Sequence, residues 1–192
     1  LIGVANVSPW HGYDRILKGL ADYLKRPIFS RRKVIFHIVG ARYPYLRELQ
    51  ALVSQLNIDE WVVFHQPTQG EALDVLFRES HLAIGVLGGH RKGLEIMSPL
   101  KNREYCARGI PFVLSHQDPD FSEEFQYCLR VPGNEEPVDI EKLINFLDSF
   151  HDLTYAAQCL REYAQEKLDW STKLQPVKTY LDKRLGLTSG CV

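Results

Sequence analysis

Residues 82–114 read LAIGVLGGHRKGLEIMSPLKNREYCARGIPFVL, and they contain each part of a β-α-β unit. Leu82 to Leu87 is an apolar run of strand length, and the glycine-rich loop 88–93 follows it. A helix is expected from Ser98 to Gly109, and Pro111 to Leu114 is a second short apolar run. Strands of a parallel sheet are buried on both faces, so they are nearly continuously apolar, and helical crossovers join them. The stretch therefore predicts two parallel strands connected by a helix.

The same alternation extends over the rest of the chain. We expect further strands at residues 1–5, 33–39, 61–64 and 127–131, and further helices at 14–24, 44–56, 71–78, 140–150, 155–168 and 173–185. Asp14 is expected to be the N-cap of the first helix. Short connections between strands and helices favour parallel β-α-β units in one sheet. The sequence therefore predicts one α/β domain over residues 1–185, a Rossmann-like open parallel sheet of about six strands with helices on both faces, followed by a tail at 186–192.

Composition excludes several other classes of protein. The chain has 192 residues and a mass of 22.1 kDa, which is room for one ordinary domain or two small ones. Its 45% hydrophobic and 24% charged residues are close to the averages of soluble globular proteins, which excludes a disordered tail, a fibrous rod and a disulfide-stapled miniprotein. The net charge is −1, so no overall field draws the chain to nucleic acid or to anionic membranes.

The cysteines and the apolar runs indicate the compartment. Cys106, Cys128, Cys159 and Cys191 form no CxxC and have no histidine cluster at zinc-like spacing. We therefore expect reduced thiols, a cytoplasmic location and no metal site. No apolar run approaches the ~18 residues of a spanning helix, and no signal peptide is recognisable. Because Leu1 lies inside an apolar stretch and no initiator methionine precedes it, we expect the chain to be part of a longer protein.

Ligands of such a sheet bind outside the carboxyl ends of its strands, at the point where the strand order reverses. The loops expected there are 6–12, 40–43, 65–70, 88–99 and 115–121. The GxGxxG of nicotinamide-binding domains does not follow the first strand, and the chain has no GxxxxGK[ST]. A dehydrogenase and a P-loop enzyme are therefore not expected.

The helix that opens near Ser98 is expected to bind an anion. Ser98 suits an N-cap, and Pro99 suits the first helical position. Free backbone N–H groups and the positive end of the dipole make such a helix start attractive to phosphate. Lys101 adds a positive charge in the first turn, and Arg91 and Lys92 bring two more from the glycine-rich loop.

Glu104 is the carboxylate best placed to accompany a phosphate at this helix start. It lies six residues beyond Ser98, which is about 9 Å along a helix axis. A carboxylate there suits the hydroxyls of a ribose whose phosphates lie at the helix start. Spacing alone leaves the alternative that Glu104 pairs with Lys101 and that Arg91 and Lys92 are solvated.

Other polar and aromatic residues have structural interpretations. Asp118 and Asp120 are expected to form an Asx-Pro turn rather than a metal pair. His65 is expected to be structural. Trp10 either stacks on a ligand or packs under the next element, and His11 either donates to a phosphate or caps the following helix.

The segment SPLKNREYCARGIPFVLS at residues 98–115 resembles the nucleotide-binding signature in the C-terminal half of GT-B glycosyltransferases, most closely the family-4-like retaining enzymes of bacterial polysaccharide assembly. The resemblance covers nearly the whole chain. VANVSPWHGYDRILKGL, FHIVG, VVFHQPTQGEAL and DWSTKLQPVKTYL are similar to the family's first strand and helix, second strand, third strand and C-terminal Trp-containing segment. It implies the donor-binding half of a GT-B fold, whose last helix crosses back toward an N-terminal domain that carries most of the acceptor site.

The resemblance also assigns roles to single positions. In the family an E-x7-E stretch precedes a Gly-Xaa-Pro, and the second glutamate, which binds the ribose hydroxyls of the donor, matches Glu104. The first glutamate falls at Ile96, and a one-residue slip would present Glu95 instead.

The family's pyrophosphate-binding positions differ more. Its arginine falls near Asn6, its lysine-glycine falls at His11 and Gly12, and a frequent glycine falls at Gln66. We hypothesise that Arg91, Lys92 and Lys101 replace the lost charge. The residues expected to contact the donor are thus Asn6, His11, Gly12, Gln66, Arg91, Lys92, Glu95, Ser98, Leu100, Lys101 and Glu104, and no catalytic residue is assigned.

The activity that the resemblance implies is transfer of a sugar from a nucleotide diphosphate-sugar to a hydroxyl acceptor, with retention of configuration and without a metal or other cofactor. The isolated domain is expected to bind the donor but to transfer nothing. Two alternatives are a non-catalytic domain that binds a nucleotide sugar or a partner, and half of a GT-B-shaped sugar epimerase. The base, the sugar, the acceptor, the oligomeric state and a peripheral membrane association of the full-length protein are left open.

Overall fold

A six-stranded parallel sheet forms the centre of the computed structural model, which describes residues 1–40 and 44–186. Its strands are β1 (Ile2–Val4), β2 (Phe36–Val39), β3 (Val62–His65), β4 (Ala83–Ile84), β5 (Phe112–Leu114) and β6 (Cys128–Arg130). They lie in the order β3-β2-β1-β4-β5-β6, so the order reverses between β1 and β4. Most of the expected loop 40–43 and all but the first residue of the expected tail 186–192, with Cys191, lie outside the described residues.

Seven α-helices connect and follow the strands in the described part of the chain. They are α1 (Tyr13–Leu24), α2 (Tyr45–Gln55), α3 (Glu71–Arg78), α4 (Leu100–Arg108), α5 (Ile140–Asp148), α6 (Leu153–Tyr163) and α7 (Trp170–Leu185). Short 3-10 turns lie at η1 (Pro9–His11), η2 (Ile28–Ser30), η3 (Asp59–Trp61) and η4 (Gly89–Lys92), and one π-helical turn, η5 (Ala164–Leu168), joins α6 to α7. The predicted alternation of strands and helices is confirmed.

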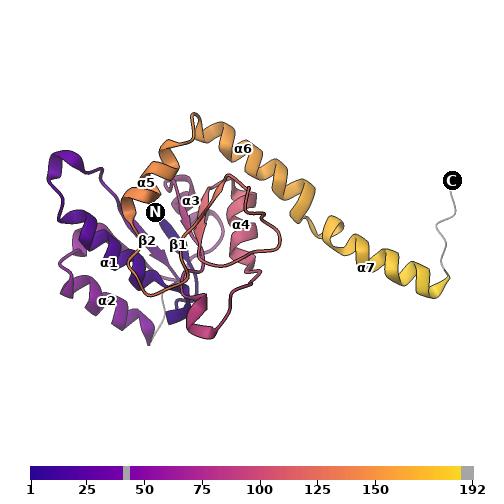
Figure 1. Cartoon of the computed structure of the whole chain (residues 1–192), viewed down its shortest axis with the longest axis horizontal. Helices are drawn as coiled ribbons and strands as arrows, with labels where there is room; N and C mark the ends of the chain where they lie inside the picture. The colour runs from indigo at the N-terminus through magenta and orange to yellow at the C-terminus, as the bar shows by residue number, and fades with distance from the viewer. Residues whose placement is uncertain (41–43, 187–192) are drawn as a thin grey trace.

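Successive strand residues enter two different hydrophobic clusters because side chains alternate across a sheet. In β5, Val113 packs with α1, α2 and α5, whereas Phe112 and Leu114 pack with α3, α4 and α6. Neighbouring residues of β4 divide in the same way. Helices therefore cover both faces, as predicted, and the domain has one core on each side of the sheet (Figure 1).

Two expected helix caps are wrong by one or two residues. The N-cap of α1 is Gly12, in the left-handed region with φ of 70°, and Asp14 lies in the first turn, where its carboxylate faces Arg91. The N-cap of α4 is Pro99, and the Ser98 hydroxyl accepts a hydrogen bond from Arg103 at 2.6 Å. In both cases an arginine takes the side chain that would otherwise cap the helix: Arg91 of η4 binds Asp14, and Arg103 of α4 itself binds Ser98.

The last helix leaves the body of the domain. Figure 1 shows α7 extending away from the sheet beyond α6. Its apolar side chains recur every three or four residues along one stripe and are about half or more exposed: Trp170, Leu174, Val177, Leu181 and Leu185. In the described part of the chain, no helix combines the length and the apolar character needed to cross a membrane.

Candidate nucleotide-binding site

The loops after β1 and β4 touch each other at the reversal point of the sheet. The backbone N–H of Gly88 donates to the Trp10 carbonyl at 3.1 Å, and the N–H of Leu87 donates to the His11 carbonyl at 3.0 Å. A Cβ atom at Gly12 would lie 2.7 Å from the Gly88 nitrogen, so glycine is required for this approach. The two loops are therefore packed directly against each other and joined by backbone hydrogen bonds.

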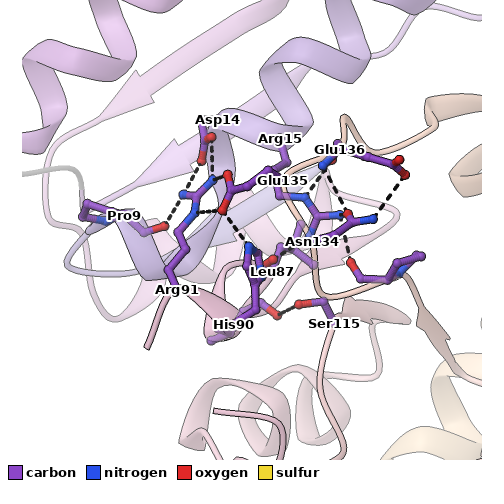
Figure 2. A network of polar contacts seen from close by, with 12 residues as sticks. Pro9, Asp14, Arg15, Leu87, His90, Arg91, Ser115, Asn134, Glu135 and Glu136 are labelled. Atoms are coloured by element: carbon purple, nitrogen blue, oxygen red, sulfur yellow. Dashed lines mark hydrogen bonds and ion pairs between the residues drawn. The ribbon is translucent and has the colours of Figure 1, made fainter. Parts of the chain in front are cut away.

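Two carboxylates hold Arg91, which lies in η4 on the loop after β4. Its guanidinium donates to both oxygens of Asp14, each at 2.8 Å, and to both oxygens of Glu135, at 2.8 and 2.5 Å (Figure 2). It also donates to the Pro9 carbonyl at 2.6 Å. These carboxylates already balance the charge of Arg91, so contact with a phosphate would require it to leave them.

Arg15 fixes the loop that carries Glu135. It is 1% exposed and donates to the carbonyls of Leu87, Pro132 and Glu136 at 2.6, 2.9 and 2.8 Å. Figure 2 shows Arg15 and Arg91 side by side, each reaching the segment 132–136. Arginine suits this role because its planar fork offers five donors in fixed directions. The sequence reasoning missed Arg15, although a charged residue between the apolar residues Tyr13, Ile16 and Leu17 is a signal of a buried polar network.

Arg103 organises the start of α4. It donates to the Ser98 hydroxyl and to the Pro99 carbonyl, at 2.6 and 3.1 Å, and to both oxygens of Asp118 at 2.5 Å. Asp120 accepts from Arg103 and from Lys173 of α7. Asp118 and Asp120 are thus arginine partners, and no cluster of metal-ligating side chains occurs within the ranges 1–40 and 44–186.

Lys101, at the start of α4, and His11, in η1, both lie against the Tyr13 side chain, and we call the part of the molecule around them the η1–α4 region. The Lys101 ammonium is 3.4 Å from the Tyr13 hydroxyl and 5.6 Å from the centre of its ring. His11 is 4% exposed, and its Nδ1 accepts from the Ser8 N–H at 3.0 Å. Burial, and then the nearby Lys101, lower the pKa of His11 to about 3, so the ring is neutral and carries its proton on Nε2. Both groups are donors beside the free N–H groups at the start of α4.

Glu104 pairs with Arg108 rather than with Lys101. The Arg108 Nε donates to its carboxylate at 2.9 Å, one turn along α4, and a second nitrogen of Arg108 reaches Asp74 at 2.6 Å. The expected alternative pair with Lys101 is therefore wrong. Glu104 is partly exposed, so its carboxylate remains accessible to solvent.

A β-bridge fixes the position of the first glutamate of the resembled motif. Ile96 pairs with Gln117 through the backbone. The Gln117 N–H donates to the Glu95 carbonyl at 2.8 Å, and the Gln117 carbonyl accepts from the Met97 N–H at 2.9 Å. A one-residue slip that presents Glu95 would break these two hydrogen bonds. Ile96 therefore occupies the motif position, and the exposed Glu95 side chain belongs to the neighbouring position.

The other expected residues lie farther out. Asn6 and Leu100 are exposed, and Lys92 places its ammonium 4.5 Å from the centre of the Trp10 ring. Gln66 is exposed after the edge strand β3, two strands from β1. The structure thus brings His11, Gly12, Arg91, Lys92, Ser98, Leu100 and Lys101 to one region, and it leaves Gln66 outside it.

A separate cavity of about 440 Å³ lies at the amino ends of the strands, the end of the sheet opposite to the η1–α4 region. Residues before β1, β2 and β4, including Leu1, Val34 and His81, line it together with Leu143 of α5. Because Rossmann-type sheets bind ligands at the carboxyl ends of their strands, the η1–α4 region is the better candidate for the functional site.

No protein-family model matches the chain, and no curated protein matches its sequence. Solved glycosyltransferases share its fold. Anabaena HepE in complex with UDP has a TM-score of 0.69 and 19% identity, over 95% of this chain and 48% of that one. Sucrose-phosphate synthase from Thermosynechococcus elongatus has a TM-score of 0.65 and 16% identity, over 97% of this chain and 46% of that one.

The C-terminal domain of a group 1 glycosyl transferase, LpcC from Francisella tularensis, has a TM-score of 0.62 and 15% identity, over 88% of this chain and 86% of that one. The chain therefore spans about half the length of the first two proteins and nearly all of a separate C-terminal domain. The described residues have the Rossmann-like fold of a GT-B glycosyltransferase domain.

Proposed function

We propose that this chain is the donor-binding half of a glycosyltransferase, and that it binds a nucleotide diphosphate-sugar at the η1–α4 region. The observation that carries the proposal is the position of Lys101 and His11 beside the start of α4, at the reversal point of the sheet. The comparison with HepE supports it, because that protein was solved with UDP and also with UDP and glucose.

The diphosphate and the ribose of the donor have matching groups in the η1–α4 region. The N–H groups at Leu100 and Lys101 and the Lys101 ammonium suit the diphosphate, and the His11 Nε2–H suits a further phosphate oxygen. Glu104 suits the ribose hydroxyls. Asn6, Gly12, Arg91, Lys92, Ser98 and, farther out, Glu95 and Gln66 complete the proposed surroundings.

The same groups serve the chemistry of transfer. Negative charge grows on the diphosphate when the glycosidic bond to the donor breaks, and preorganised donors at a helix start stabilise that charge. We propose retention of configuration, no metal, a role in bacterial polysaccharide synthesis and a cytoplasmic location. All of these rest on the sequence resemblance.

The acceptor site belongs in this proposal to a second domain. The exposed apolar stripe of α7 suits packing against that domain, because no described residue covers its five side chains and they remain exposed to solvent. The isolated chain then binds the donor without transferring the sugar, and membrane association of the full-length protein is a property of the other half.

A non-catalytic nucleotide-sugar-binding domain is the second candidate, and Ile96 favours it. The β-bridge to Gln117 keeps an apolar residue where the resembled enzymes have a glutamate. A transfer assay on the full-length protein separates the two functions: sugar transfer supports the first, and donor binding without turnover supports the second.

Calorimetric titration of the chain with UDP, GDP and ADP tests the proposal. One nucleotide should bind, and Glu104→Ala should weaken it at least tenfold, since two hydrogen bonds to a carboxylate contribute about 1–3 kcal/mol. Arg108 keeps Asp74 as a partner in this variant. Glu60→Ala, an exposed carboxylate of η3 ahead of the edge strand, is the matched control and should bind like the wild type. Binding unaffected by Glu104→Ala would place the ribose elsewhere.

A further inference from the structure

Lys101 is a partly buried cation that lacks a carboxylate partner within residues 1–40 and 44–186. Its ammonium contacts the hydroxyl and the ring of Tyr13, and no ion pair to it occurs there. The nearest acidic side chain on its own helix, Glu104, is engaged by Arg108 at 2.9 Å. The charge of Lys101 is therefore not compensated by an ion pair with any described residue.

The groups packed around Lys101 do not supply the missing negative charge. On η1, His11 is neutral, and on α1, burial raises the pKa of Tyr13 well above its usual value. On α4, burial also raises the pKa of Tyr105, to about 13, so this neighbour is neutral as well. Lys92 lies on η4 over Trp10 and adds a positive charge to the region. Burial lowers the pKa of Lys101 to about 7, and Glu104 opposes this shift only in part.

We propose that Lys101 takes up a proton from solvent when a nucleoside diphosphate binds, so that its side chain becomes positively charged as the anion arrives. The neutral amine becomes an ammonium, and its new N–H donates to a phosphate oxygen. His11 keeps the same protonation state throughout. This inference rests on the proposed function and names Lys101 as the group whose charge depends on the ligand.

The consequence is a pH-dependent affinity. Below about pH 6, one unit under the pKa of about 7, nearly every Lys101 is charged before binding, and little proton uptake is expected. At pH 8, with a pKa of about 7, about nine-tenths of the free sites hold the neutral amine, so close to one proton accompanies each nucleotide. Affinity should therefore fall up to about tenfold per pH unit above neutrality.

Calorimetry of the 192-residue chain with UDP, GDP and ADP, at pH 8 in HEPES and in Tris, measures the protons taken up. The binding enthalpy of the wild type should differ between the two buffers by nearly one proton's worth of buffer ionisation. Lys101→Arg carries a permanent charge, so it should bind with no buffer dependence and with an affinity that is flat above pH 7. Lys142→Arg, at an exposed lysine of α5 outside the proposed site, is the matched control and should keep the full proton uptake.

Several results would overturn the inference. Nucleotide binding without proton uptake by the wild type removes it and leaves the proposed function intact, whereas failure of all three nucleotides to bind removes both. Uptake that persists in Lys101→Arg assigns the proton to another group. A carbon NMR titration of the free chain gives an independent reading: the Lys101 Cε signal, identified by its absence from Lys101→Arg, should titrate near pH 7, and titration near pH 10 contradicts the inference.

Discussion

Arg91 and Asp14 form a bidentate ion pair across 77 residues of sequence, with both N–O distances at 2.8 Å. The pair joins the loop after β4 to the first turn of α1, and Glu135 closes it from the segment that Arg15 holds. Two loops that meet at the proposed donor site are thus fixed to each other by side chains before any ligand binds. This preorganisation is the main structural contribution of Arg91 that we find.

Replacement of Arg91 by alanine should destabilise the domain. It leaves the Asp14 carboxylate, which is 13% exposed, with only two long contacts, to Lys18 and to the Tyr45 hydroxyl, each at 3.5 Å. We expect a loss of about 1–3 kcal/mol in the free energy of unfolding, measured by urea denaturation, because removing one partner strands a partly buried charge. Lys92→Ala, on the same loop, should cost less than 0.5 kcal/mol, roughly the effect of an ordinary surface change. Equal stabilities of the two variants would show that the network contributes nothing.

Gly12 should tolerate alanine worse than Gly93 does. Both have a positive φ, of 70° and 66°, so a side chain strains the backbone at either position. Only at Gly12 would the Cβ atom also meet neighbouring backbone, 2.7 Å from the Gly88 nitrogen, whereas nothing lies within 4 Å at Gly93. Gly93→Ala should cost about 1 kcal/mol, and Gly12→Ala at least twice that, by thermal unfolding. A smaller loss in Gly12→Ala would show that the loops can separate freely.

Acid should destabilise the fold through its buried neutral histidines. Because the folded pKa of His11 is about 3 and the usual value is 6.5, the unfolded chain binds more protons between these pH values. The stability that neutral His11 contributes is complete above pH 6.5 and is lost as the pH falls toward 3, by up to about 1.4 kcal/mol per pH unit.

His11→Gln tests this sign, since glutamine does not titrate. The free energy of unfolding of the variant should decrease less steeply below pH 6.5 than that of the wild type, whatever its stability at neutral pH. His81→Gln, an exposed histidine at the amino ends of the strands, is the control and should follow the wild-type slope. Parallel curves for His11→Gln and wild type would mean that the pKa of His11 is the same in the folded and the unfolded chain.

The fold was predictable because its signals are local. Apolar strand segments such as Phe36–Val39 and Phe112–Leu114 lie within the expected runs, and glycine ends α4 where the pattern indicates. The strand limits differ most at β4, where only Ala83 and Ile84 belong to the strand. Gly85 still donates to the Val113 carbonyl at 2.8 Å, and the Val86 carbonyl accepts from Ser115 at 3.1 Å, but the Leu87 N–H donates to the His11 carbonyl in the loop after β1.

The site was predictable only in part, because its polar contacts join distant segments. Sequence placed Lys101, His11 and Glu104 from the helix start and from the resemblance, and the structure brings the first two together. The partners of Arg91, Arg15 and Arg103 lie up to 121 residues away in sequence. No spacing rule indicates such pairs, so the assignment of Arg91 to a free basic loop overlooked its carboxylates.

Mapping of backbone amide shifts by NMR, as UDP, GDP and ADP are added to the chain, tests the central claim most directly. The account predicts that one nucleotide changes the backbone amide shifts of His11, Leu100 and Lys101, in the η1–α4 region. It predicts no comparable change around the cavity at the amino ends of the strands, at His37, His81 and Leu143. Shifts gathered around that cavity, with the start of α4 unchanged, would contradict the placement of the site.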